Sequence, residues 1–263
     1  MVSTPTVPDP GPPPAALALA HHWLAEEPQS ALANFTWVNN VTTAAGHCHF
    51  AWDGTGEAVH CLARRRGLPF TAISVEGSDP AIVRRLAAEL LPAGQSAYTL
   101  APPRLAAVLG QAAQVEESHP EWQMVFRPTA TALDPGPARP LSLADLPAMQ
   151  RLAQVGEAMV FSPESLQRGA FFGVFAADEL VAMGGVQNEL PGWAEIGSIV
   201  THPAHRRQGY AAQVVSALIR HLAASDRRVF LCLFQTNTPA RALYEKLGFA
   251  IANELHLLHW RLP

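Results

Sequence analysis

Apolar and polar positions along this chain alternate between two periods and predict helices and strands that follow one another. Ala211, Val215, Leu218 and Leu222 recur at spacings of four, three and four, which is one face of an α-helix. A β-branched run over residues 194–201 precedes this helix and predicts a strand. In the same half of the chain we expect helices over 143–155 and 163–168, and strands over 171–176, 180–187, 228–234 and 256–262. This pattern is typical of an α/β (α+β) domain with a mixed sheet.

The N-terminal half shows a similar order of elements. Two predicted helices, 15–26 and 29–37, precede three predicted strands over 47–52, 58–64 and 70–75. Asp79 then caps a helix over 79–91 that has Pro80 in its first turn. A strand over 97–100, a helix over 103–112 and a strand over 121–126 complete the predicted order.

Proline-rich segments mark the predicted domain boundaries. The first fourteen residues hold six prolines, no cationic residue and no apolar core, which predicts a disordered tail and not a signal peptide. Residues 127–140 hold four prolines and a glycine without an apolar period. We therefore expect a tail (1–14), an N-terminal α/β domain (15–127), a linker (128–140) and a C-terminal domain (141–263).

Composition excludes some classes of protein. The net charge is −4, and Lys246 is the only lysine, which disfavours a nucleic-acid partner. No run reaches the roughly 18 apolar residues of a membrane helix, so we expect no membrane association. Three cysteines, Cys48, Cys61 and Cys232, leave an odd thiol, which favours a reducing compartment. The predicted location is the cytoplasm, with the chain a monomer or a homodimer.

The segment between the strand at 194–201 and the following helix is the strongest functional signal. Small residues at Gly209, Ala211 and Ala212 would leave unpaired backbone N–H groups at the positive end of the helix dipole. Arg206 and Arg207 beside them suit phosphate oxygens. There is no Gly-x-Gly-x-x-Gly and no Gly-Lys-Ser/Thr motif, which disfavours dinucleotide and nucleoside triphosphate folds. The segment fits a diphosphate site, although an ordinary helix start would look the same.

A second helix signal follows the strand at 228–234. Thr238 is the expected N-cap, Pro239 fits the first helical position, and Gly248 suits a left-handed C-cap. Ala240, Leu243 and Leu247 form its expected buried stripe. Tyr244 lies beside that stripe and should be half-buried, either as a packing residue or as a catalytic one.

Together these segments resemble the GNAT superfamily of acetyltransferases. Arg206-x-x-Gly209-x-Ala211 is similar to the family's Arg/Gln-x-x-Gly-x-Gly/Ala signature, and Asn237 to Phe249 is similar to its Asn…Ala…Leu-Tyr…Gly-Phe pattern. The resemblance is clear over residues 138–263. It implies a GNAT fold there and, in the N-terminal half, a degenerate copy of that fold as in two-domain proteins of the glycine N-acyltransferase type.

The resemblance also implies a site for acetyl-CoA. Two neighbouring strands, 194–201 and 229–234, should splay apart, with pantetheine pairing along Ile199, Val200 and Thr201. Asn237 would bind pantetheine or order a water molecule, and Tyr244 would protonate the leaving thiolate. Pyrophosphate would lie on the loop and first helical turn, which comprise Arg206, Arg207, Gln208, Gly209, Tyr210, Ala211 and Ala212.

Glu195 is the candidate general base that would deprotonate an amine substrate. It stands fourteen residues before Gly209, the offset implied by the histone-type members, and alternation predicts the same face as Ile199 and Thr201. A solvated edge glutamate is the alternative, in which case a water chain could serve. Another branch of the family carries its base five residues before the Asn, a position that is Cys232 here.

No metal is expected. His47, Cys48 and His49, and His60 and Cys61, are potential zinc ligands, but adjacent strand residues point to opposite faces and the spacing fits no standard zinc module.

The function predicted from the sequence is an acyl-CoA-dependent N-acyltransferase that transfers acetyl from acetyl-CoA to a small-molecule amine. The alternatives are a non-catalytic acyl-CoA-binding or sensing module, which would not need Tyr244 or Glu195, and a protein or peptide N-acetyltransferase.

Overall fold

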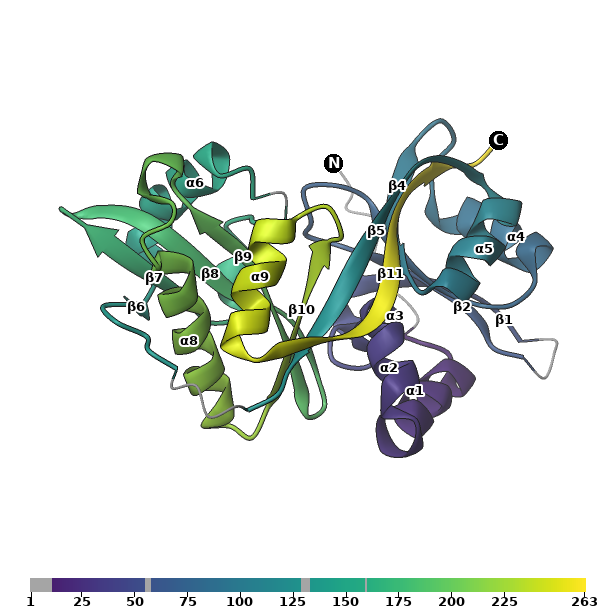
Figure 1. The fold of residues 1–263 in the computed structure, drawn as a ribbon. Helices are drawn as coiled ribbons and strands as arrows, with labels where there is room; N and C mark the ends of the chain where they lie inside the picture. Colours follow the sequence, from purple (N-terminus) through teal and green to yellow (C-terminus); the bar gives the residue numbers. More distant parts are fainter. Residues whose placement is uncertain (1–10, 55–57, 129–132, 159) are drawn as a thin grey trace, which may run out of the picture. The chain divides into compact units, whose positions relative to one another are not determined.

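A computed structural model describes residues 11–54, 58–128, 133–158 and 160–263. The chain divides into two compact units (Figure 1). The N-terminal unit comprises residues 1–119 and 256–263, and the C-terminal unit comprises residues 120–255. Of the predicted disordered tail, residues 1–10 lie outside the described residues, whereas Pro14 already begins the first helix.

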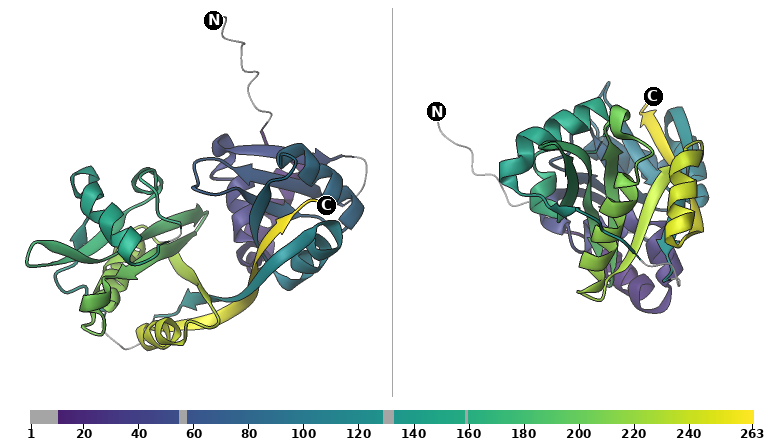
Figure 2. Two further views of the ribbon diagram at one scale, coloured as in Figure 1. Left: turned by 90° about the horizontal axis from the view of Figure 1, so that it is seen from above. Right: turned by 60° about the vertical axis from the view of Figure 1, so that its left-hand side comes forward.

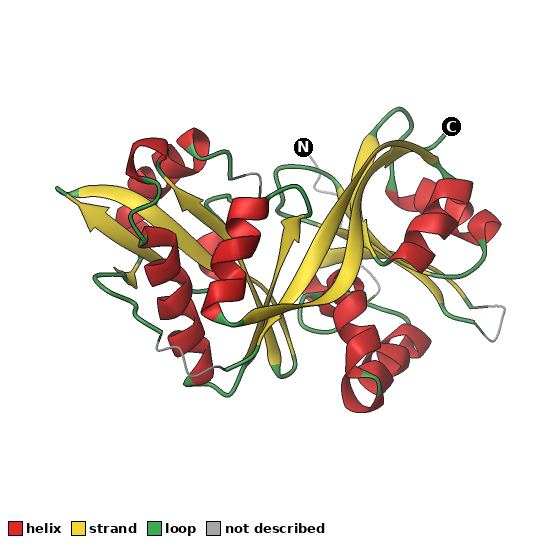
Figure 3. Ribbon diagram, viewed as in Figure 1, coloured by secondary structure: helices red, strands yellow, loops and turns green. Residues whose placement is uncertain are grey.

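The N-terminal unit has an α/β fold, as the sequence predicts (Figure 3). Its strand order is β1-β2-β3-β4-β11, with β3 and β4 parallel. Its helices are α1 (Pro14–Glu26), α2 (Pro28–Ala33), α3 (Phe35–Val41), η1 (Ala45–His47), α4 (Pro80–Leu90) and α5 (Pro103–Ala112). Its strands are β1 (Cys48–Asp53), β2 (His60–Arg65), β3 (Ala72–Glu76), β4 (Ser96–Ala101) and the last part of β11 (Phe249–Arg261).

Helices cover both faces of this sheet. Alternate strand residues point to opposite faces, so each face presents side chains that a helix can cover. On one face, Leu62, Ile73 and Val75 pack with Leu86 of α4 and Leu109 of α5 in one apolar cluster. On the other face, α3 is tied to the strands by polar contacts. Trp37 donates from Nε1 to the carbonyl of Cys61 at 2.9 Å, and Asn40 donates to the Ser74 hydroxyl at 2.9 Å.

The C-terminal unit is a mixed sheet in the order β5-β10-β9-β8-β7-β6, with β11 beside β5. Its helices are η2 (Leu143–Asp145), α6 (Leu146–Val155), α7 (Ser165–Arg168), η3 (Pro203–His205), α8 (Tyr210–Ala223) and α9 (Thr238–Leu247). Its strands are β6 (Arg139–Pro140), β7 (Phe171–Ala176), β8 (Glu179–Leu190), β9 (Trp193–Thr201), β10 (Arg228–Phe234) and parts of β5 (Gln114–Phe126) and β11.

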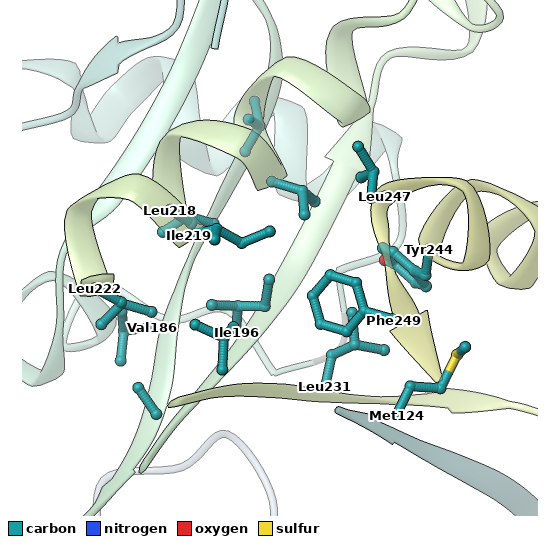
Figure 4. Close-up of a cluster of buried hydrophobic side chains, with 14 of the residues drawn as sticks. Met124, Val186, Ile196, Leu218, Ile219, Leu222, Leu231, Tyr244, Leu247 and Phe249 are labelled. Carbon is teal, nitrogen blue, oxygen red and sulfur yellow. The ribbon is translucent and has the colours of Figure 1, made fainter. Parts of the chain in front are cut away.

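Helices also cover both faces of the second sheet, as the further views show (Figure 2). Leu218 and Leu222 of α8 and Tyr244 and Leu247 of α9 pack with Ile196 of β9 in one cluster (Figure 4). Met149 and Leu152 of α6 pack on the opposite face with Met183 and Val200. Ala211, expected in the buried stripe of α8, is half-buried, and the stripe is instead extended by Val214 and Ile219.

The units do not divide at the predicted linker. The last part of the linker forms β6, which pairs with β7, so Arg139 and Pro140 belong to the C-terminal sheet. The division falls instead inside β5, after His119, and β11 runs from the C-terminal unit into the N-terminal one. Strand β11 therefore begins at Phe249, well before the predicted start at residue 256. A composition shift marks a loop, but it does not reveal a strand shared by two units.

No helix among the described residues has the length and apolar character needed to cross a membrane.

Candidate acyl-CoA site

The loop between β9 and α8 presents free backbone donors at a helix N-terminus. Gly209 is the N-cap of α8 with φ 85°, a left-handed conformation that suits glycine, and Arg207 is also left-handed with φ 62°. In the described structure, no hydrogen bond is found from the backbone N–H groups of residues 207–212. A Cβ added at Gly209 would meet no atom within 4 Å. The donors are therefore open to an anionic ligand at the positive end of the dipole.

The predicted loop residues surround these donors. Arg206, Arg207, Gln208 and Gly209 are exposed, and Tyr210, Ala211 and Ala212 form the first, half-buried turn of α8. The Arg206 side chain donates from Nε to the carbonyl of Thr201 at 3.4 Å, which holds it against the end of β9. One guanidinium is thus placed close to the helix start with its remaining N–H groups available.

Strands β9 and β10 splay apart as the family resemblance implies. Their parallel ladder joins Arg228 to Trp193, Val229 to Ala194 and Phe230 to Glu195. Beyond that point, residues 196–201 and 231–234, all of them described, do not pair with each other. Ile199, Val200 and Thr201 therefore line a strand edge that an extended ligand can pair with.

Two irregularities in the β8–β9 ladder shape this edge. Ser198 has φ 50° and lies where the register shifts between Met183–Val200 and Gly185–Gly197. A second shift occurs between Val186–Ile196 and Asn188–Glu195, which makes Gln187 the extra residue of β8. Such bulges re-aim side chains near sites.

The bulge at Ser198 changes the faces on which the predicted residues lie. Ala194 and Ile196 belong to the cluster under α8, so Glu195 between them points to the opposite face. Ile199 also packs against the α8 cluster, whereas Val200 packs with α6. The expectation that Glu195 shares a face with Ile199 and Thr201 is therefore wrong, because the extra residue reverses the alternation.

Glu195 is not a solvated edge residue; only 9% of its surface is exposed. Burial raises its pKa to about 7, while hydrogen bonds from the Asn188 amide and the Cys232 thiol act in the opposite direction. The pKa of Cys232 is raised well above its ordinary value by burial first, then by the charges of Glu195 and Glu121. A carboxylate with a pKa near neutrality can both take and release a proton.

Tyr244 is buried more deeply than predicted, with 7% of its surface exposed. Its ring lies 5.8 Å from that of Phe249 in the cluster under α8 and α9 (Figure 4). Burial raises the pKa of its hydroxyl to about 12, which keeps the group protonated. No hydrogen bond to this hydroxyl is found among the described residues. The Tyr244 hydroxyl is thus an uncharged hydrogen-bond donor for which no acceptor is found among the described residues.

Asn237, and not Thr238, caps helix α9. The Asn237 side-chain oxygen accepts from the backbone N–H of Ala240 at 3.3 Å, and Pro239 follows in the first turn. Gly248 ends the helix with φ 101°, as predicted. Because the Asn237 oxygen serves the cap, its amide N–H₂ is the group available to a ligand.

Comparisons with known proteins identify the fold. Residues 171–257 match the family model described as FR47-like protein. A GNAT-family protein from Novosphingobium aromaticivorans has 22% sequence identity, with 88% of this chain and 98% of that chain covered and a TM-score of 0.71. The chain has the GNAT fold. A comparison with curated proteins finds no match.

Two other solved structures extend the GNAT likeness over both units. A GCN5-related N-acetyltransferase-like protein from Streptococcus suis is 12% identical over 94% of this chain and 99% of its own, with a TM-score of 0.60. A tandem GNAT protein from the clavulanic acid biosynthesis pathway is 14% identical over 92% of this chain and 93% of its own, with a TM-score of 0.55.

In the N-terminal unit, the start of the helix after β3 is occupied by the protein's own side chains. Asp79 accepts from the N–H groups of Ala81 and Ile82 at 2.8 and 3.3 Å, so a carboxylate already occupies the start of α4. Buried Glu76, the last residue of β3, accepts from both terminal nitrogens of Arg104 at 3.0 and 2.7 Å. The likeness to the glycine N-acyltransferase type stays a prediction.

The histidine and cysteine residues singled out in the N-terminal half have structural partners. The His60 ring accepts from the backbone N–H of Asp79 at 3.1 Å, and Cys61 is buried beside Trp37. In the part of the chain that the structure describes, no group of three or more potential ligands could hold a metal ion.

Sequence reasoning missed the polar partners of Glu195. Asn188 lies beyond the predicted end of its strand at residue 187, and Cys232 was considered only as a position without a base. The Gln-Asn pair at residues 187 and 188 continues an otherwise apolar strand and could have indicated polar partners for a buried group. Polar residues at consecutive strand positions are unusual in a sheet covered on both faces.

Proposed function

We propose that this GNAT-fold protein is an acyl-CoA-dependent N-acyltransferase that transfers acetyl from acetyl-CoA to a small-molecule primary amine. The observation that carries the proposal is the set of free N–H groups at residues 207–212, which follow the part of β9 that does not pair with β10. A diphosphate with an extended amide-bearing arm matches these two features together.

Different residues of the chain would bind the pyrophosphate and the pantetheine arm of acetyl-CoA. The N–H groups of residues 207–212 and the guanidinium of Arg206 would hold the pyrophosphate. Backbone groups of Ile199, Val200 and Thr201 would pair with the pantetheine amides, and the Asn237 amide would donate to the same arm. Acetyl-CoA then supplies the thioester that a neutral amine attacks.

Two side chains would carry out the proton transfers, one as a base and one as an acid. Glu195, with a pKa of about 7, would take a proton from the incoming ammonium group, either directly or through water. Tyr244, whose phenol stays protonated at neutral pH, would donate to the leaving thiolate. Burial supports these roles, because it raises the pKa of the Glu195 carboxyl toward neutrality and keeps the Tyr244 hydroxyl protonated.

Burial of the proposed base, Glu195, supports a slender amine as the substrate that receives the acetyl group. Glu195 is 9% exposed as a residue, and the charge of the buried residue Glu121 contributes to the raised pKa of Cys232. A primary amine on a narrow chain can approach such a site and gains from the negative potential.

The test is thiol release from acetyl-CoA with a panel of small amines, amino acids and peptides. We expect release that depends on a particular small amine, and a fall in kcat of roughly 100-fold in Tyr244→Phe with little change in KM for acetyl-CoA. Tyr98→Phe, which removes the hydroxyl of a tyrosine in the N-terminal unit stacked on His259, is the matched control and should leave kcat unchanged.

The other outcomes separate the alternatives. Release with peptides alone would favour a peptide N-acetyltransferase. Tight binding of acetyl-CoA without release for any acceptor would favour a non-catalytic binding module.

A further inference from the structure

We propose that Asn188 is a positioning residue that holds the carboxylate of Glu195 in place for proton transfer. The inference rests on the proposed function and extends it to strand β8, to which neither the motifs nor the family resemblance assigns a role. Its basis is the hydrogen bond from Asn188 Nδ2 to Glu195 Oε2, between side chains on adjacent strands.

The backbone places Asn188 in this position through an irregularity. Val186 pairs with Ile196, so a regular antiparallel ladder would put Gln187 opposite Glu195. The register shift instead pairs Asn188 with Glu195, and directly opposed residues on one face lie close enough for their side chains to interact. The extra residue therefore selects which polar side chain reaches the carboxylate.

The displaced residue, Gln187, contacts the other irregularity of the same ladder, the bulge at Ser198. Its Nε2 donates to the hydroxyl of Ser198, the left-handed residue of β9, at 2.7 Å. Its side chain lies over Gly197, where an added Cβ would come within 2.8 Å of Gln187 Cγ. Gln187 and Asn188 thus contact two successive parts of the site, the bulged strand edge and the buried carboxylate.

Asn188 is suited to hold a base without neutralising it. An amide is an uncharged donor, so it stabilises the carboxylate form, whereas an arginine would hold the carboxylate ionised and too weakly basic. The other titratable groups near Glu195 are the Cys232 thiol of β10, which also donates to it, and, beyond that thiol, the Glu121 carboxyl of β5. A carboxylate has about four acceptor positions, so two protein donors leave capacity for the substrate.

The experiment is the pH dependence of kcat at saturating acetyl-CoA and amine, measured for the full chain and its variants. Wild-type kcat should rise through a midpoint near pH 7, and Glu195→Gln should lose this rise. Asn188→Ala should move the midpoint up by about one pH unit, which lowers kcat about tenfold at pH 6 and less than twofold at pH 9. KM for acetyl-CoA should stay unchanged, because Asn188 is not part of the phosphate loop.

Two further variants guard against a merely structural effect. Asn188→Asp keeps the size of the side chain but replaces the donor with a like charge, so its midpoint should move further in the same direction. Asn253→Ala is the matched control, since Asn253 donates from Nδ2 to Gln123 Oε1 at 2.6 Å in the same unit, and no hydrogen bond between Asn253 and Glu195 is found among the described residues. It should keep the wild-type midpoint even if it lowers stability.

The outcomes distinguish this inference from the proposed function. If Glu195→Gln loses the rise but both Asn188 variants keep the wild-type midpoint, the positioning role is refuted and the proposed function stands. If no amine is acetylated by the wild-type chain, the proposed function fails, and the positioning role fails with it.

Discussion

Replacing Glu195 with glutamine is expected to stabilise the protein at neutral and alkaline pH but not in mild acid. Glutamine has nearly the same shape, and its side-chain oxygen can still accept from Asn188. The substitution removes only the capacity to ionise, in a side chain that is 9% exposed. The stability difference between the two proteins therefore reports the cost of a buried negative charge.

The sign and size of the effect follow from the pKa of Glu195. Burial raises it from 4.5 to about 7, so between these values the folded state binds more protons than the unfolded state. The wild-type free energy of unfolding should therefore fall as the pH rises from 4.5 to 7, and level off above 7. A pKa difference of this size corresponds to about 3 kcal/mol, which Glu195→Gln should recover in full at pH 8.

The assay is urea unfolding of both proteins at several pH values between 4.5 and 8.5. Glu189→Gln is the control, because Glu189 is a half-exposed neighbour on β8 that forms an ion pair with Arg227 at 3.7 Å. Its effect should be small and nearly independent of pH. A difference between wild type and Glu195→Gln that does not change with pH would refute the reasoning, since the carboxyl would then not be desolvated by folding.

Three further predictions test the loop, the packing and the N-terminal unit. Gly209→Asp should weaken acetyl-CoA binding at least tenfold in calorimetric titration, because its carboxylate would repel phosphate at the start of α8; an unchanged Kd would contradict the phosphate site. Gly185→Ala should cost about 1–3 kcal/mol in chemical unfolding, since its Cβ would come within 2.4 Å of the Phe171 ring; wild-type stability would mean that the ring moves freely. Asp79→Ala should cost about 1 kcal/mol by loss of the α4 cap and leave the Kd for acetyl-CoA unchanged; a changed Kd would show that the N-terminal unit contributes to binding.

Local sequence determined many of the elements and the loop before α8. The apolar spacing of α8, the proline and glycine at the two ends of α9, and the small residues around Gly209 act within one or two helical turns. Such short-range causes are visible in a single chain, because propensity, capping and periodicity need no knowledge of distant partners. Periodicity accordingly gave α5 limits of 103–112 that agree with the structure, whereas the GNAT fold and the separation of β9 from β10 were implied by the family resemblance of the two motifs.

Tertiary structure alone decided how the candidate side chains meet. The bulge at Ser198 turned Glu195 away from Ile199, and the extra residue Gln187 brought Asn188 opposite Glu195. The sharing of β5 and β11 between the units likewise depends on strand pairing between segments more than a hundred residues apart. Strand register is a long-range property set by packing on both faces, and one inserted residue reverses every later side chain. The family resemblance therefore singled out Glu195, whereas its face, its burial, its partners and its near-neutral pKa came from the assembled sheet.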